Sequence, residues 1–349
     1  MPSPIQRDPA ATSAALASWL ERTLPEAAGA VVTRLDAPPS SGFSGETILL
    51  DADWGGEPHE LVVRVAPTTY TVFLEPHFEA QFRTMKILSE QTDVPMPEML
   101  AYESDTSILG APFSLMRRVE GEAAPDSPAY TDAGWIKDAT PDQQAALYES
   151  GLSAMARIHG LDWRALGLQF LERDELDYVE RYHAWARDLD GGPNPIMDEA
   201  MAWLRSHPVK PTDDPALCWG DARPGNQLYR DWECVAVLDW EMVTIGDPIM
   251  DLAWWLFLER FHTVGSGFPL PPGFPGEAGA IARWSELTGR EVDPEVFRYY
   301  LVFAGIRFGI VMIRLATLFK EFEIMPAEAD MARNNPVLHV LKAILDESA

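Results

Sequence analysis

The segment from Trp219 to Trp240 carries three polar side chains whose types and spacing suit phosphoryl transfer. Asp221 is followed five positions later by Asn226, and Asp239 ends an apolar run thirteen positions beyond that. Transfer of a phosphoryl group from a nucleotide needs a carboxylate that orients and deprotonates the attacking hydroxyl, together with oxygen ligands for the Mg²⁺ that bridges the phosphates. We therefore expect Asp221 to act as the general base, and Asn226 and Asp239 to hold Mg²⁺.

These side chains must be positioned by two short strands. Apolar runs predict strands over residues 227–230 and 234–238, and a hairpin of the two would bring Asn226 and Asp239 together. The competing interpretation is that Asp221 and Asn226 are only turn residues around a Pro-Gly pair, because Gly, Pro, Asn and Asp favour turns on local grounds. The occurrence of all three polar residues at this spacing favours a catalytic loop.

Arg223 lies between the expected base and the expected metal ligands. Its guanidinium can neutralise charge on the transferring phosphoryl group, which would make it a catalytic residue. It can equally form an ion pair with Asp221 or with Glu241, and the sequence leaves these alternatives open.

Three runs of sequence resemble one known family. WGDARPGNQLY, VLDWE and GDPIMDLAWW are similar, in this order, to the aminoglycoside phosphotransferase and choline kinase family, whose loop usually reads His-Gly-Asp-x-x-x-x-Asn. The resemblance implies an α+β, two-lobed protein-kinase-like fold with a small N-terminal β-sheet lobe and a larger, mostly helical C-terminal lobe. It implies a nucleotide-binding lobe over residues 1–118 and a catalytic and acceptor-binding lobe over residues 119–349.

The resemblance also implies nucleotide contacts in the first lobe. A Gly- and Ser-rich turn would place backbone N–H groups over the phosphates, and an arginine falls where kinase-like folds carry a strand lysine. Backbone groups of the segment between the lobes would bond adenine. The expected nucleotide-binding residues are therefore Ser41, Gly42, Phe43, Ser44, Arg64, Arg117 and Val119. The expected nucleotide is ATP, with GTP as the alternative.

Two positions depart from the family pattern. Trp219 replaces the histidine that supports the loop, and Arg64 replaces the strand lysine. Arginine keeps the charge, but it presents a planar fork of donors in place of a compact ammonium. Asp251 resembles the family's aspartate that braces the loop by hydrogen bonds. These departures keep a second hypothesis open, in which the chain is a non-catalytic, nucleotide-binding pseudokinase.

Hydrophobic periodicity places strands first and helices afterwards, which indicates an α+β arrangement. The expected elements are a helix over 10–24, strands over 30–36, 45–52 and 60–66, a helix over 77–91, a strand over 113–119, and helices over 141–159, 174–189, 195–206, 248–260, 274–288, 294–320 and 327–346. A Pro- and Asp-rich stretch follows the last of these strands, and we place the boundary between the lobes at its start.

The composition is strongly acidic. The 349 residues include 54 acidic and 27 basic side chains, for a net charge of −27, and 47% of the residues are hydrophobic. This charge disfavours binding to nucleic acid and to anionic membranes, and it would attract a cationic acceptor such as an aminoglycoside or choline. An acidic surface that only confers solubility explains the charge equally well. We expect an ordered monomer or homodimer.

Further patterns concern the location of the protein. Cys218 and Cys234 offer no metal spacing and no disulfide framework, which suits the cytoplasm, and the N-terminus lacks a secretory pattern. The apolar stretch over residues 299–319 is interrupted by Arg307 and Arg314 on one helical face. We therefore interpret it as a buried helix of a soluble lobe and not as a membrane span.

The acceptor is the least determined part of the prediction. Aromatic and acidic side chains between residues 125 and 210 could hold a cation, whereas Arg307 and Arg314 could contact an anionic acceptor such as an acyl-CoA. The sequence as a whole predicts a Mg-ATP-dependent phosphotransferase that moves the γ-phosphate to a hydroxyl of an antibiotic-, choline- or hydroxyacyl-like small molecule.

Overall fold

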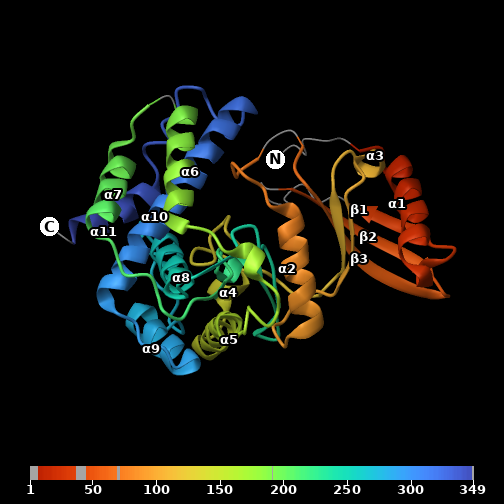
Figure 1. The fold of residues 1–349 in the computed structure, drawn as a ribbon, viewed down its shortest axis with the longest axis horizontal. Helices are drawn as coiled ribbons and strands as arrows, with labels where there is room; N and C mark the ends of the chain where they lie inside the picture. The colour runs from red at the N-terminus through yellow and green to blue at the C-terminus, as the bar shows by residue number, and fades with distance from the viewer. Residues whose placement is uncertain (1–6, 37–44, 69–70, 191, 348–349) are drawn as a thin grey trace. The chain divides into compact units, whose positions relative to one another are not determined.

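The computed structural model of the chain describes residues 7–36, 45–68, 71–190 and 192–347. The chain divides into two compact units, Met1–Glu120 and Gly121–Ala349, called here the N-terminal unit and the C-terminal unit (Figure 1). The sequence analysis placed the boundary between its two lobes two residues earlier, after residue 118.

The N-terminal unit is built on an antiparallel sheet. Its strands follow the order β1-β2-β3-β5-β4, and each strand is hydrogen-bonded to its neighbours in that order. The strands are β1 (Val31–Asp36), β2 (Glu46–Trp54), β3 (Glu57–Val65), β4 (Met99–Glu103) and β5 (Phe113–Arg117). The sequence analysis missed β4, because Pro95 and Pro97 mark that segment as a turn.

Helices lie on both sides of this sheet (Figure 1). The helices of the N-terminal unit are α1 (Pro9–Thr23), α2 (Phe78–Gln91) and α3 (Thr106–Leu109), with a 3₁₀ turn η1 (Pro25–Ala27). Apolar side chains of α1, among them Trp19, form one core with alternate residues of β3, which are Leu61, Val63 and Val65. Because successive strand residues point to opposite faces, Arg64 lies on the face away from this core.

The C-terminal unit is mostly helical. Its helices are α4 (Trp135–Asp138), α5 (Pro141–His159), α6 (Glu175–Asp190), α7 (Pro195–Ser206), α8 (Ile249–His262), α9 (Gly276–Thr288), α10 (Pro294–Glu321) and α11 (Pro336–Asp346), with 3₁₀ turns η2 (Gln169–Leu171) and η4 (Val264–Ser266). Helix α10 packs against α6, α7, α8 and α11. By length and composition α10 could cross a membrane, but 67% of its most apolar stretch is buried inside the structure.

Helices α1, α5, α7, α10 and α11 begin with the same local signal, a capping Asp, Thr or Asn followed by proline. The capping residues, whose side chains accept hydrogen bonds from N–H groups of the first turn, are Asp8, Thr140, Asn194, Asp293 and Asn335. Proline suits the first helical position because it has no N–H to leave unpaired. Helix α11 therefore starts at Pro336, nine residues later than predicted.

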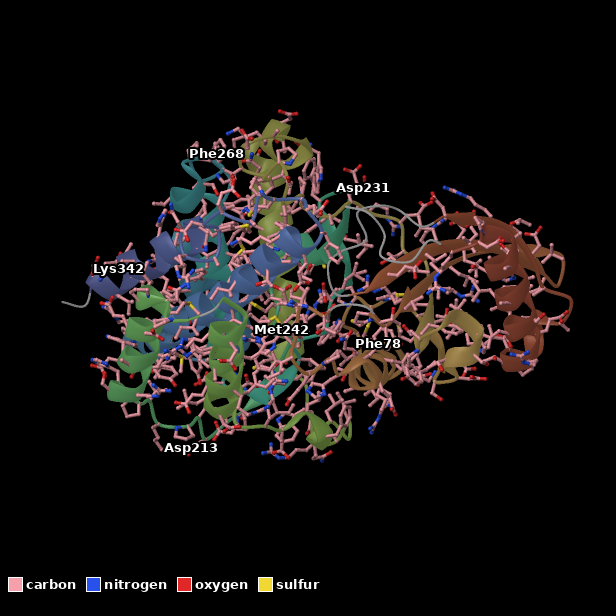
Figure 2. All side chains as sticks on the ribbon, turned by 90° about the horizontal axis from the view of Figure 1, so that it is seen from above. Phe78, Asp213, Asp231, Met242, Phe268 and Lys342 are labelled. Atoms are coloured by element: carbon pink, nitrogen blue, oxygen red, sulfur yellow. The ribbon has the colours of Figure 1, made fainter. Side chains whose placement is uncertain are left out.

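Two small antiparallel sheets of two strands each carry the loops of the predicted site. Strand β6 (Ala216–Cys218) pairs with β9 (Thr244–Gly246), and β7 (Gln227–Arg230) pairs with β8 (Glu233–Val237). The first loop, residues 219–226, leads from β6 to β7 and ends in the 3₁₀ turn η3 (Pro224–Asn226). The second loop, residues 238–243, returns from β8 to β9, and its Met242 is buried among other side chains (Figure 2). Asp213, in the segment before β6, lies at the edge of the C-terminal unit in the same view (Figure 2).

The order of elements confirms the predicted α+β class. A small sheet-based N-terminal unit precedes a larger helical one, and the predicted helices and strands are present apart from the start of α11. The two small sheets interrupt the helices of the C-terminal unit and place both loops within it.

Candidate active site

A buried carboxylate braces the first loop. Asp251, in the first turn of α8, accepts hydrogen bonds from the backbone N–H groups of Trp219 at 2.6 Å and Gly220 at 2.8 Å. The family resemblance implied this role for Asp251. Its Oδ2 also lies 3.0 Å from Nε2 of His159, whose Nδ1 accepts the indole N–H of Trp284 at 3.0 Å. A neutral imidazole with its proton on Nε2 satisfies both contacts.

Gly220 makes the turn that precedes Asp221. Its φ is +94°, and a Cβ built on it would lie 2.2 Å from the carbonyl oxygen of Met242. Only glycine tolerates both the left-handed backbone and this approach of the second loop. The close contact between the two loops therefore fixes the backbone position from which the Asp221 side chain projects.

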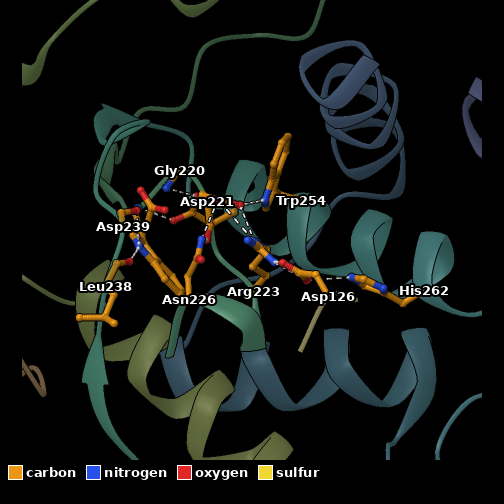
Figure 3. Close-up of polar contacts among 11 residues, drawn as sticks. Asp126, Gly220, Asp221, Arg223, Asn226, Leu238, Asp239, Trp254 and His262 are labelled. Atoms are coloured by element: carbon orange, nitrogen blue, oxygen red, sulfur yellow. Dashed lines mark hydrogen bonds and ion pairs between the residues drawn. The ribbon is translucent and has the colours of Figure 1, made fainter. Parts of the chain in front are cut away.

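The carboxylate of Asp221 is held by donors from two different elements (Figure 3). Its Oδ1 accepts the indole N–H of Trp254 on α8 at 2.7 Å, and its Oδ2 accepts Nδ2 of Asn226 at 2.6 Å. Nε of Arg223 lies 3.3 Å from Oδ1, and 19% of the Asp221 side chain is exposed. The carboxylate is thus fixed in one orientation and still accessible to a hydroxyl.

Arg223 has a partner that the sequence analysis did not consider. Its Nη1 donates to both carboxylate oxygens of Asp126, at 2.6 and 2.7 Å (Figure 3). Nε2 of His262 lies 3.5 Å from the same carboxylate. Burial opposes ionisation of Asp126, but His262 and Arg223 outweigh it and lower the pKa of Asp126 to about 2. The pairing of Arg223 with Asp221, one of the alternatives that the sequence left open, is present at 3.3 Å, which is longer than the pairing with Asp126.

The β7–β8 hairpin brings Asn226 and Asp239 together. Gln227 is in register with Val237, and the N–H of Leu238 donates to the carbonyl oxygen of Asn226 at 2.8 Å. Asp239 follows Leu238 directly. The two predicted metal ligands therefore lie at the same end of one hairpin.

Trp219, which stands where the family usually has histidine, links the two loops. It is fully buried, and its indole N–H lies 2.8 Å from the carbonyl oxygen of Leu238 and 3.2 Å from that of Asp239. Asp239 has a φ of +60°, a region that few non-glycine residues occupy. The indole therefore stabilises the backbone at a residue whose conformation is uncommon.

The end of the hairpin offers oxygen atoms of the kind that Mg²⁺ prefers. Because Nδ2 of Asn226 donates to Asp221, the amide oxygen points away from that carboxylate, and Asp239 adds a carboxylate. Among the residues that the structure describes, no group of three His, Cys, Asp or Glu side chains could hold a metal ion. An amide oxygen and a carboxylate are ligands that suit Mg²⁺, and phosphates and water would have to supply the remaining ligands.

The predicted nucleotide residues of the N-terminal unit are described only in part. Those that lie outside the described residues are Ser41, Gly42, Phe43 and Ser44. Arg64 donates to Oγ1 of Thr47, its register partner on β2, at 2.6 Å, and a Cβ on Gly45 would lie 3.7 Å from its Nη2. The segment that follows the predicted phosphate turn thus lies beside Arg64. Arg117 ends β5 and Val119 follows two residues later, and their nucleotide contacts stay predictions.

Sequence reasoning missed two residues of the site, Trp254 and Asp126. Trp254 could have been found, because it lies three positions after Asp251 and residues at this spacing share a helix face. Asp126 had no comparable signal. It lies 97 positions before Arg223, in a Pro-rich stretch without hydrophobic periodicity, so only the folded chain brings the two together.

The chain is similar to parts of longer curated proteins. Acyl-CoA dehydrogenase family member 11 of Gallus gallus is 31% identical over 261 residues, which are 72% of this chain and 32% of that protein. Acyl-CoA dehydrogenase family member 10 of Mus musculus is 29% identical over 255 residues, which are 71% of this chain and 22% of that protein. The chain thus spans about a third or less of these relatives.

Solved structures share the fold over nearly the whole chain. A candidate aminoglycoside phosphotransferase of Ralstonia eutropha gives a TM-score of 0.70 at 22% identity, covering 96% of this chain and 98% of that one. A macrolide 2′-phosphotransferase of Brachybacterium faecium gives 0.56 at 18% identity, covering 91% and 96%. An aminoglycoside phosphotransferase in complex with AMP-PNP and hygromycin B gives 0.52 at 16% identity, covering 96% and 99%. These similarities confirm the predicted kinase-like fold.

A family model described as "Phosphotransferase enzyme family" matches residues 37–291. The match is more than half of the chain, and it includes both loops of the candidate site. It agrees with the family that the sequence motifs resemble. The chain belongs to the phosphotransferase enzyme family.

Proposed function

We propose that this phosphotransferase moves the γ-phosphoryl group of ATP, or alternatively GTP, to a hydroxyl of a small molecule, and that Asp221 receives the hydroxyl proton. The observation that carries the proposal is the carboxylate of Asp221, which Trp254 and Asn226 hold in one orientation beside the Asn226–Asp239 pair. The neighbour in complex with AMP-PNP and hygromycin B supports a nucleotide donor and a small-molecule acceptor.

The proposed step forms one bond and breaks another at the same phosphorus. The acceptor oxygen bonds to the γ-phosphorus while the bond from this phosphorus to the β,γ-bridging oxygen breaks, and ADP leaves with that electron pair. The hydroxyl proton passes to Asp221. Arg223 keeps positive charge next to Asp221, because Asp126 holds it there.

Mg²⁺ would neutralise charge on the phosphates, and Asn226 and Asp239 are the residues that would hold it. The pseudokinase alternative was based on Trp219 and Arg64. The hydrogen bonds of the Trp219 indole to the backbone of the second loop weaken this alternative, because they supply the support that the family's histidine would give.

The decisive experiment measures Mg-dependent ADP release over a mixed panel of acceptors, namely aminoglycosides, macrolides, choline-like amines, sugars and hydroxyacyl-CoAs. Asp221→Asn should lose turnover while it keeps nucleotide binding, and Asp239→Asn should weaken the binding of Mg-nucleotide itself. Asp213→Asn is a matched control, because the Asp213 side chain is 87% exposed and lies outside the site.

Acceptor-dependent release in the wild type and in Asp213→Asn, but not in Asp221→Asn, would support the proposal and name the acceptor class. Wild-type turnover in both site variants would show that the site assignment is wrong. Nucleotide binding without turnover of any acceptor would favour the pseudokinase alternative.

A further inference from the structure

Arg307, in the middle of α10, is a buried cation that has no hydrogen-bond partner in the described part of the chain. Only 4% of the residue is exposed. All three nitrogens of its guanidinium are buried and unpaired among the residues that the structure describes. A guanidinium carries five N–H donors and keeps its proton. Such a group is strongly unfavourable in a protein interior unless something binds it.

The immediate neighbours of Arg307 do not satisfy its donors. Its Cζ lies 5.3 Å from the ring centroid of Trp254 and 5.6 Å from that of Phe303. Ring faces attract a cation, but they are only weak acceptors for its N–H groups. Burial lowers the pKa of Arg307, and the charge of Glu175 opposes this only in part. Glu175 is itself bonded to Arg173 at 2.5 Å.

Arg173 places a second cation in the same region. Its guanidinium lies 4.2 Å from the ring centroid of the buried Tyr178, and both arginines act electrostatically on this tyrosine. Arg173 also acts to lower the pKa of Arg307. Like charges that share a partly buried region repel each other, and an anion bound between them would remove this repulsion.

Trp254 connects Arg307 to the proposed base. The indole N–H donates to Oδ1 of Asp221 at 2.7 Å, and the centroid of the same ring system lies 5.3 Å from Cζ of Arg307. One indole therefore separates the carboxylate from the unpaired guanidinium. An anionic group on Arg307 and a hydroxyl at Asp221 would therefore lie on either side of this one ring, which is only 3% exposed.

We propose that Arg307 binds an anionic group, a carboxylate or a phosphate, on the acceptor whose hydroxyl meets Asp221. This inference rests on the proposed function and narrows it. The acceptor is then a hydroxyl-bearing anion and not a cation such as an aminoglycoside or choline. The net charge of −27 favoured a cationic acceptor in the sequence analysis. The guanidinium of Arg307, which is separated from the proposed base by one indole, favours an anionic acceptor instead.

Glu175 supplies the rival explanation. Its Oε2 is buried and has no hydrogen-bond partner within the described part of the chain, so a small rearrangement would pair it with Arg307 and make Arg307 structural. Arg314 is the matched control for Arg307. It lies seven residues later on α10, and its side chain is only 11% exposed and is 3.9 Å from Glu321.

A binding titration tests the inference without turnover. The full chain, saturated with Mg-AMP-PNP, is titrated with ω-hydroxycarboxylates beside their amides, and with sugar phosphates beside the parent sugars, at constant ionic strength. The wild type and Arg314→Met should bind the charged member of a pair about ten- to a hundredfold more tightly. Arg307→Met should lose this preference. Equal or undetectable binding of both members by the wild type would overturn the inference.

The rival explanation predicts a different pattern of thermal stability. If Glu175 is the partner, Arg307→Met and Glu175→Gln both lower Tm, and neither changes the preference between charged and neutral probes. If Arg307 binds the acceptor, Arg307→Met keeps or raises Tm, and inorganic phosphate raises the Tm of the wild type but not of this variant. Comparison of the titrations with hydroxycarboxylates and with sugar phosphates shows which of the two anions Arg307 binds.

Turnover separates failure of this inference from failure of the proposed function. Arg307→Met should raise KM for a charged acceptor and reduce the charged-to-neutral ratio of kcat/KM about ten- to a hundredfold. Turnover with the same ratio in the wild type and Arg307→Met would overturn the inference and leave the proposed function intact. If AMP-PNP does not bind and no acceptor reacts, the proposed function fails, and the titration on the free chain still decides the role of Arg307.

Discussion

Arg223 and Arg307 are both largely buried in the C-terminal unit, yet their surroundings differ in kind. Arg223 donates to both oxygens of Asp126 and lies 3.3 Å from Asp221. Arg307 instead contacts two aromatic rings and has no hydrogen-bond partner among the residues that the structure describes. Against the effect of burial, the carboxylates raise the pKa of Arg223, while burial lowers the pKa of Arg307. The first charge completes the protein's own structure, and the second is the one that we propose binds the acceptor.

The acidic residues of α8 show the same contrast. Both oxygens of Asp251 accept hydrogen bonds from the first loop or from His159. Glu259, eight residues later, is buried with an Oε2 that has no partner among the described residues, and burial raises its pKa to about 7. The residue type alone therefore does not tell which buried charge supports the fold. The set of bonded partners does.

The largest effect on stability is expected for substitution of Asp251, a buried charge whose two oxygens both accept hydrogen bonds. Asp251→Asn replaces two acceptor oxygens by one, so a loop N–H or His159 loses its acceptor and faces an amide N–H. We expect the free energy of unfolding to fall by about 3 kcal/mol and turnover to be lost. Urea denaturation and ADP release measure both. A variant as stable as the wild type would show that the carboxylate does not brace the loop.

Matched substitutions of the two arginines should move stability in opposite directions. Arg223→Met leaves Asp126 without its main partner and should lower the free energy of unfolding by about 1–3 kcal/mol. Arg307→Met removes a buried, unpaired charge and should raise it, or leave it unchanged, in the absence of acceptor. Denaturant unfolding of both variants without ligand measures this. Shifts of the same sign would remove the contrast between the two sites.

Glu259→Gln should stabilise the protein only above the pH at which the carboxyl ionises in the unfolded chain. Its pKa is raised from 4.5 to about 7 in the folded state, so the folded protein holds this proton more tightly and loses stability as pH rises through that interval. The glutamine variant lacks this loss. At pH 8 it should be more stable than the wild type by on the order of 1–3 kcal/mol, with little difference at pH 4.

The control for this pH dependence is Glu286→Gln, because the Glu286 side chain is 67% exposed. The difference in free energy of unfolding between this variant and the wild type should change little with pH. Equal behaviour of the two glutamine variants at pH 8 would contradict the assignment of Glu259 as a poorly solvated carboxyl.

The smallest effect should come from Trp254→Phe, which separates the two contacts of this side chain. Phenylalanine keeps an aromatic ring for Arg307 but removes the N–H that donates to Asp221. We expect kcat to fall about five- to thirtyfold, equivalent to about 1–2 kcal/mol, with an unchanged preference between charged and neutral acceptors. Steady-state kinetics on one charged and neutral pair tests this. A change in preference with unchanged kcat would reverse the assignment.

The parts of the site that could be predicted are those determined by local sequence. The spacing of Asp221 and Asn226 within one loop, and a single hairpin after it, suffice to place Asp239 nearby. The partners Asp126 and Trp254 depend on how distant segments pack, and periodicity carries no information about that. Arg307 was recognised as a charge in an apolar stretch, but only the folded chain shows that no described residue forms a hydrogen bond with it.

Helix α8 presents side chains to three separate parts of the site. Asp251 holds the backbone of the first loop, Trp254 holds Asp221, and His262 lies against Asp126. Their relative directions depend on the helical pitch, in which each residue advances by about 100°. One inserted or deleted residue between Asp251 and His262 would rotate part of this set away from the site. Related chains should therefore diverge along α8 by substitution, and changes in length should accumulate in the loops that flank it.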